Sequence, residues 1–302
     1  MLPFRSILCP VDFSPHAAHA LRHAAALAAS AHAKLTVAWV TDPLLARAAV
    51  VYALDPKGEQ AREDLDAFVT ESLPSGASPP LTLVLAVGAP DEEIARIARE
   101  EQVDLIVMGT HGLSGYKKMF FGSTTERVLR QAVAPVLAVP VPEERSAFLN
   151  ANQTRADIKT VVVAIDFGEQ SAALAAYGVK IAGAFGAKPV LVHVVARDTA
   201  PGRWRPTVDA HQQSVSERAR EELSRLAGER GDGAAEAVVS TGHPADEIAT
   251  LVAKRQAGLI VMGLVGKTGL LGARPGSIAY RVLILAPAPV LVVPPATLGI
   301  KA

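Results

Sequence analysis

The chain has 302 residues; half are hydrophobic and a fifth are charged, a globular composition with room for two domains. Thirty Lys and Arg residues balance thirty Asp and Glu residues, so no net basic field is present to hold a nucleic acid by its phosphates. The single cysteine, Cys9, excludes a disulfide framework within the chain, and we expect its side chain to be buried. No signal-like segment or bilayer-length apolar run is visible, so we expect a cytoplasmic protein that does not bind membranes.

The first half alternates between apolar runs and helical patterns. In chain order, strands are predicted at 5–11, 34–40, 81–87, 103–108 and 134–140, and helices at 16–30, 59–73, 90–101 and 123–133. Strands that alternate with helices predict a parallel sheet with right-handed crossovers. Because the apolar runs are continuous, we expect helices on both faces of the sheet.

A glycine-rich stretch follows the fourth predicted strand. That strand ends in Gly109, Gly112 follows, and Gly122 and Ser123 precede a helical pattern. Glycines allow a ligand to approach the backbone closely, and the first amides of a helix are donors at the positive end of its dipole. Ser123 and Thr124 add hydroxyl groups, so this stretch predicts a phosphate site.

The same pattern occurs again 154 residues later. Gly263, Gly266, Gly276 and Ser277 repeat the glycine motif, and Asp166 and Val194 repeat Asp12 and Val40. The repeat predicts two copies of one β/α domain. We expect domains at 1–141 and 158–302, joined by a polar linker at 142–157.

These motifs resemble the universal stress protein family in its tandem form. The resemblance rests on the repeated glycine spacing, on PVDFS and AIDFG after the first strand of each half, and on the closing PVLAVP and PVLVVP. It implies an α/β fold of two tandem doubly wound parallel five-stranded sheets, each in order 3-2-1-4-5 with helices on both faces, of the adenine nucleotide alpha-hydrolase-like type. It also implies regulatory binding of ATP, with Mg²⁺ accompanying the nucleotide. In such a fold ligands bind at the carboxyl ends of the strands where the order reverses.

The resemblance assigns a role to individual residues of the first half. It places adenine against the backbone of Val40 and ribose near Pro10, Asp12 and Gly109. It places the phosphates on Gly112, Gly122, Ser123 and Thr124, with Met108 and His111 lining the site. The corresponding candidates in the second half are Asp166, Val194, Met262, Gly263, Gly266, Gly276 and Ser277.

The second copy departs from the first at three of these positions. Ile278 stands where the first half has Thr124, Val265 replaces His111, and Ala164 replaces Pro10. Leu271 and Gly272 also replace Lys117 and Lys118. Because a hydroxyl and two cations are lost, we expect the first half to bind nucleotide more tightly and the second site to be empty, weaker or selective for another nucleotide.

Several motifs have a second interpretation. Ser123 with Glu126 fits a capping box, which would stabilise a helix without any ligand. In the second half Tyr280 replaces Glu126, so the box is absent there while Gly276 and Ser277 remain, and this difference favours the phosphate interpretation. Gly266 and Lys267 resemble part of a P-loop, but the glycine that this motif requires is missing. His16, His19 and His23 share one predicted helix, where packing is a better interpretation than metal binding.

Three functions remain open from the sequence. The first is a nucleotide-binding stress protein whose halves pair through their proline-flanked last strands, as an intrachain pseudo-dimer. The second is a slow ATPase that uses the same site, although no catalytic group is evident. The third is a protein-interaction scaffold with relic sites. Protein partners, and a further homodimer, are not defined by the sequence.

Overall fold

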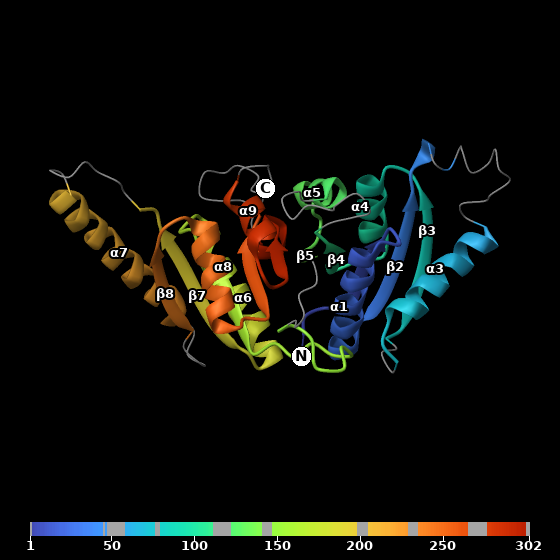
Figure 1. The fold of residues 1–302 in the computed structure, drawn as a ribbon, viewed down its shortest axis with the longest axis horizontal. Helices are drawn as coiled ribbons and strands as arrows, with labels where there is room; N and C mark the ends of the chain where they lie inside the picture. Colours follow the sequence, from blue (N-terminus) through green and yellow to red (C-terminus); the bar gives the residue numbers. More distant parts are fainter. Residues whose placement is uncertain are drawn as a thin grey trace.

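A computed structural model describes residues 2–44, 46, 58–75, 79–110, 122–140, 147–197, 205–228, 235–264 and 277–299. The described strands form one ten-stranded sheet, and the two sequence repeats lie side by side along its length (Figure 1). In the first half the strands are β1 (Ser6–Val11), β2 (Lys34–Thr41), β3 (Leu81–Val87), β4 (Leu105–Gly109) and β5 (Val136–Val139). In the second half they are β6 (Thr160–Ala164), β7 (Lys188–Val195), β8 (Glu236–Thr241), β9 (Leu259–Gly263) and β10 (Val290–Val293).

The sheet has the order β3-β2-β1-β4-β5-β10-β9-β6-β7-β8. Strand pairs within each half are parallel, so each half has the predicted doubly wound order 3-2-1-4-5. The two halves meet where β5 and β10 pair antiparallel, with Leu137 opposite Leu291. Pairing with its own copy covers the sheet edge that each half would otherwise expose.

Helices cover both faces of the sheet, as the continuous apolar strands predicted. The helices are α1 (Pro15–Ala31), α3 (Glu59–Ser72), α4 (Pro90–Glu100), α5 (Ser123–Arg130), α6 (Ser171–Phe185), α7 (Arg205–Gly228), α8 (Pro244–Arg255) and α9 (Ile278–Leu285), followed by a short 3-10 helix, Pro295–Leu298. Side chains of α1, α3, α6 and α7 belong to one buried apolar cluster, and those of α4, α5, α8 and α9 belong to the other. The sheet therefore separates two hydrophobic layers.

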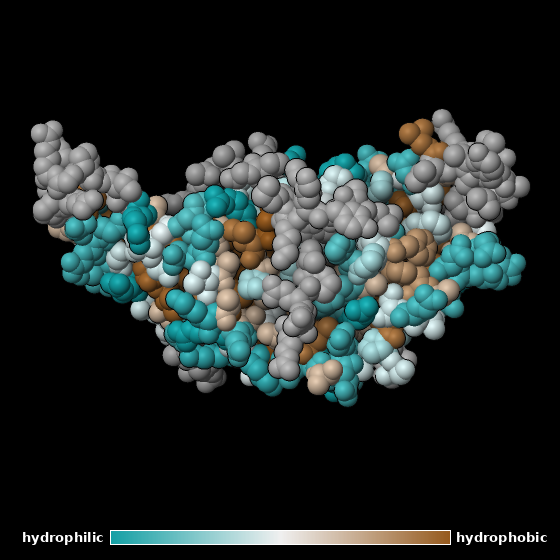
Figure 2. All heavy atoms as spheres, viewed as in Figure 1, coloured by the Kyte–Doolittle hydropathy of each residue, from teal (hydrophilic) through white to brown (hydrophobic). Residues whose placement is uncertain are grey.

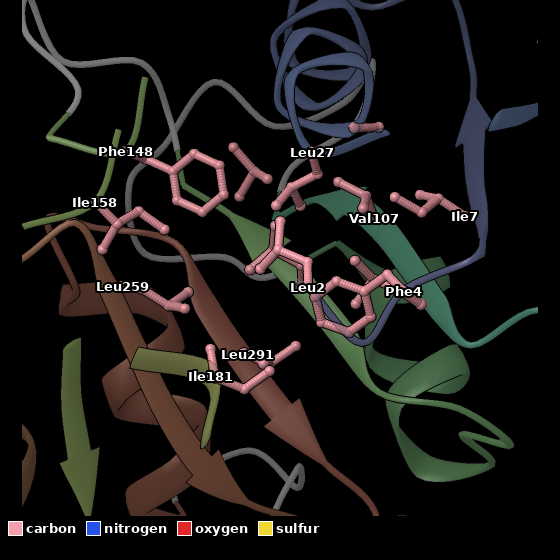
Figure 3. Close-up of a cluster of buried hydrophobic side chains, with 14 of the residues drawn as sticks. Leu2, Phe4, Ile7, Leu27, Val107, Phe148, Ile158, Ile181, Leu259 and Leu291 are labelled. Atoms are coloured by element: carbon pink, nitrogen blue, oxygen red, sulfur yellow. The ribbon is translucent and has the colours of Figure 1, made fainter. Parts of the chain in front are cut away.

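The first of these clusters is continuous across the two halves. Figure 3 shows Val107 of the first half, Leu291 of the second half and Phe148 of the connecting segment in one group of side chains. Phe148 is fully buried, and the Ala156 N–H donates to the Ser30 Oγ at 3.2 Å. Although its sequence is polar, the described part of the connection contributes to the core.

The histidines of α1 have a packing role, as expected. His23 is fully buried, its Nδ1 lies 3.0 Å from the His19 carbonyl oxygen, and its ring centroid is 4.9 Å from that of Phe148. Burial lowers the pKa of His23 to about 3 and that of His19 to about 4. Among the described residues, no group of three or more His, Cys, Asp or Glu side chains is arranged to hold a metal ion.

The outer ends of the molecule, where α3 and α7 lie, are mostly hydrophilic on the face drawn in Figure 2. Within the described ranges, no helix is both long and apolar enough to cross a membrane. Cys9 is fully buried in β1, as predicted, and burial raises its pKa well above the usual range.

Candidate functional site

A cavity of about 300 Å³ opens at the carboxyl ends of the strands of the first half. Its walls come from the ends of β1, β2 and β4, from the first turn of α5 and from the start of α4. It therefore lies between β1 and β4, where the strand order reverses and doubly wound sheets bind ligands.

Every described first-half residue that the family resemblance assigns to the nucleotide lines this cavity. These residues are Pro10, Asp12, Val40, Met108, Gly109, Gly122, Ser123 and Thr124. Two others, His111 and Gly112, lie outside the described residues. The cavity also has lining residues that the sequence did not indicate: Val11, Ala17, Pro90, Ile94 and Thr125.

A strained turn at the end of β1 places Asp12 at the cavity. Phe13 has a φ of 60°, in the left-handed region that costs a bulky residue about 1–3 kcal/mol. Its ring packs edge-on against Trp39 and Phe68, with centroids 4.7 and 5.2 Å apart, and these contacts hold the turn. Asp12 Oδ1 accepts the Ser14 N–H at 3.1 Å, which orients the carboxylate.

Helix α5 begins at the cavity without a side-chain cap. Gly122 is its N-cap residue, and no side-chain hydrogen bond caps this end among the described residues. Ser123 is exposed, and Glu126 pairs with Arg130 instead of reaching back to the helix start. The alternative interpretation of Ser123 and Glu126 as a capping box is therefore wrong, because the helix starts one residue too early for Ser123 to cap it.

Two hydrogen bonds join this first turn to the end of β4. The Thr125 Oγ1 donates to the Gly109 carbonyl oxygen at 2.9 Å, and the Gly122 N–H donates to the Thr110 carbonyl oxygen at 2.8 Å. Since Gly109, Gly122 and Thr125 all line the cavity, these bonds set the spacing of two of its walls.

The second half differs at the equivalent positions. Ser277 is the N-cap of α9 and accepts the Tyr280 N–H at 3.2 Å, so the helix cap is made in the copy where the sequence analysis excluded the capping box. Asp166 Oδ1 accepts both the Gly168 N–H, at 2.9 Å, and the Ser171 Oγ, at 3.2 Å. Ser171 stands where the first half has Ala17, a residue of the cavity wall.

The remaining second-half candidates keep the positions of their counterparts. Val194 lies near the end of β7, and Met262 and Gly263 end β9. Gly266 and Gly276 are outside the described residues, as is the P-loop-like Lys267. The structure thus places Asp166, Val194, Met262, Gly263 and Ser277 at the carboxyl ends of strands or at the start of α9.

The fold and the cavity define a class of protein: a duplicated doubly wound α/β protein with a cavity at the switch point of its first half. A family model described as the Universal stress protein family matches residues 3–140 and again residues 157–294. The chain therefore belongs to the universal stress protein family and contains two copies of its domain.

Individual relatives agree with this assignment. A universal stress protein of Methanocaldococcus jannaschii is 29% identical over 155 residues, which cover 45% of this chain and 94% of the relative. A universal stress protein of Thermus aquaticus is 34% identical over 140 residues, covering 45% of this chain and 98% of the relative. Each of these relatives corresponds to about one half of the chain.

A solved structure shares the two-domain fold. The crystal structure of a universal stress protein from Archaeoglobus fulgidus aligns with a TM-score of 0.63 at 17% identity, covering 97% of this chain and 99% of that one. At this level of identity the likeness concerns the fold alone.

Proposed function

We propose that the first half binds ATP and that the protein acts as a regulatory, stress-response nucleotide-binding module. The observation that carries this proposal is the cavity at the switch point, whose described walls include eight of the residues that the family resemblance assigns to an adenine nucleotide. Its volume of about 300 Å³ is at the lower end of the range of small-molecule sites.

Each wall of the cavity suits one part of the nucleotide. Backbone groups at the end of β2, at Val40, suit the adenine edge, and the Asp12 carboxylate can accept hydrogen bonds from ribose hydroxyls. The uncapped first turn of α5 offers N–H groups at the positive end of the helix, and Ser123 and Thr124 add hydroxyls. The arrangement therefore matches base, sugar and phosphate in sequence along the cavity.

We infer that Mg²⁺ enters with the nucleotide. Asp12 is the one carboxylate among the residues that line the described cavity, too few for a cation site built by the protein alone. Mg²⁺ is usually held by substrate phosphates together with one or two carboxylates. When bound, it would neutralise phosphate charge beside α5.

We further propose that the second half binds ATP more weakly or not at all. Asp166 already accepts a hydroxyl from Ser171, and Ser277 is engaged as a helix cap, so two groups that would serve a nucleotide have other hydrogen bonds. In this proposal the modules at 1–141 and 158–302 work as an asymmetric pair. We place the protein in the cytoplasm, because its single cysteine is a buried free thiol and the chain has no disulfide that would need an oxidising compartment.

The test is the nucleotide content of the purified protein, followed by calorimetric titration with ATP and Mg²⁺. We expect about one ATP per chain and a higher affinity for ATP than for GTP. Close to two ATP per chain would contradict the asymmetry. No nucleotide in the purified protein and no heat of binding would overturn the proposed function.

A further inference from the structure

The hydroxyl of Thr125 connects two walls of the cavity. Thr125 lies in the first turn of α5, is 4% exposed, and donates its Oγ1 hydrogen bond to the Gly109 carbonyl oxygen at 2.9 Å. Gly109 is the last residue of β4, so the bond fastens the start of the helix to the end of the strand.

This bond holds the start of α5, which has no capping side chain among the described residues. Gly122 stands at the cap position, and the starts of α3, α4, α6 and α8 likewise have no side-chain cap. A capping side chain would occupy one of the first-turn N–H groups, which are the donors that suit phosphate. A bond from Thr125 to the strand holds the turn without using them.

The second half shows the alternative arrangement in the same molecule. Ala279 stands at the position of Thr125 and has no hydroxyl, and the α9 helix start is held by Ser277, which accepts the Tyr280 N–H at 3.2 Å. One copy therefore fastens the helix to the strand and leaves it uncapped, while the other caps it.

We propose that Thr125 is the positioning residue of the phosphate site: its bond to Gly109 keeps the uncapped first turn of α5 at the distance from β4 that phosphate binding requires. Thr125 does not need to touch the ligand for this role. The inference rests on the proposed function, since it presumes that the first half binds ATP.

The test compares Thr125→Val, which keeps the shape and removes the hydroxyl, with Thr125→Ser, which keeps the hydroxyl. ATP affinity is measured by calorimetry in the presence of Mg²⁺. Adenosine, which has no phosphate, is measured by competition against a fluorescent ATP analogue. We expect Thr125→Val to weaken ATP binding about tenfold and adenosine binding less than twofold. Thr125→Ser should bind both within twofold of the unmodified protein.

Other outcomes would overturn the inference. If Thr125→Val binds ATP within twofold of the unmodified protein, the bond does not position the site, although the proposed function survives. If it weakens ATP and adenosine equally, and circular dichroism shows a loss of helix, Thr125 has only a structural role. If the unmodified protein binds no ATP, the proposed function fails and this inference fails with it.

Discussion

Asp12 and Asp166 occupy equivalent positions but have different hydrogen-bond partners. Asp12 Oδ1 accepts the Ser14 N–H, whereas Asp166 Oδ1 accepts both a backbone N–H and the Ser171 hydroxyl. The two carboxylates therefore differ in at least one partner, the Ser171 hydroxyl, which only the second half supplies. One substitution in each half can measure this difference.

We expect Asp12→Asn to weaken ATP binding about tenfold, because a hydrogen bond to a charged group contributes roughly 1.5–3 kcal/mol. The Asn carbonyl oxygen can still accept the Ser14 N–H, so the turn is kept while the group facing the ribose becomes a donor. The matched variant, Asp166→Asn, should change the affinity less than twofold. Calorimetry with ATP and Mg²⁺ measures both, and equal losses would contradict an asymmetric pair.

Gly258 marks a close approach between the connection and the second half. A Cβ atom added at Gly258 would lie 2.3 Å from the Ala147 carbonyl oxygen, a backbone atom that cannot move aside on its own. The first half has Asp104 at the equivalent position. The missing side chain therefore makes room for the connection.

We expect Gly258→Ala to lower the free energy of unfolding by about 1–3 kcal/mol, the usual cost of forcing extra atoms into a packed site. Gly183→Ala is the matched control, because a Cβ atom at Gly183, within α6, meets nothing within 4 Å. That variant should gain about 0.5–1 kcal/mol from helix propensity. Denaturant titration measures the free energy of unfolding of both variants. A loss of stability in both would show that the close packing at Gly258 is not the cause of the loss there.

At the scale of elements, α1 carries a buried pair of neutral histidines. Burial lowers the pKa of His23 to about 3, and burial followed by the charges of Arg22 and His16 lowers that of His19 to about 4. Both values lie below the ordinary value of 6.5, so the unfolded chain takes up protons before the folded protein does. The stability contributed by the neutral pair is complete above about pH 6.5 and decreases as the pH falls towards 4.

We expect His23→Phe to reduce the acid sensitivity of the fold. Between pH 7 and pH 5, one such histidine costs about 2 kcal/mol of unfolding free energy, and the variant should retain that amount. An aromatic ring suits the site, since Tyr177 stands at the equivalent position of the second half. Urea titrations at the two pH values measure the effect. His211→Gln, at an exposed position, should leave the pH dependence of the unfolding free energy unchanged. An equal change in both variants would show that the acid sensitivity does not come from the burial of His23.

The elements were largely predictable, and the contacts between distant elements were not. The predicted strand at 81–87 coincides with β3, because a continuous apolar run bounded by Pro80 and Gly88 has few alternatives. The clustering of Asp12, Gly109 and Ser123 followed from the doubly wound order. The alternative of a capping box at Ser123 was wrong, and the Ser277 cap was not predicted, since a serine before a helix fits either a cap or a first turn and one residue of register decides between them.

The Thr125 bond and the burial of Phe148 were not predicted. Both depend on partners far away in the sequence: Gly109 lies 16 residues from Thr125, and Phe148 contacts α1 of the first half. Local composition around Phe148 is polar, so it indicated only a linker. The replacement of Thr125 by Ala279 was the one available signal, and it stood beside two other changes in the same turn, Thr124 to Ile278 and Glu126 to Tyr280.

At the scale of the whole molecule, the two halves share one sheet and both of its hydrophobic layers. The β5–β10 pair continues the sheet. Phe148 of the connection and Ile158, at the start of the second half, join the cluster that contains Leu27 and Leu291 (Figure 3). Apolar burial is the main source of folding free energy, and here the buried clusters contain side chains of both halves. We therefore expect the chain to unfold as one cooperative unit.

Phe148→Ala tests this coupling. Removing a fully buried phenylalanine costs about 3–5 kcal/mol, and the loss should appear as one calorimetric transition at lower temperature, with equal calorimetric and van't Hoff enthalpies. Leu44→Ala, at a side chain that is 74% exposed, should leave the transition in place. Two separate transitions, with only one moved by Phe148→Ala, would mean that the halves fold independently. If a single transition also moves to higher temperature on addition of ATP, a ligand bound in the first half stabilises the second half as well. The reason is that ligand binding to the native state stabilises every part that unfolds with it.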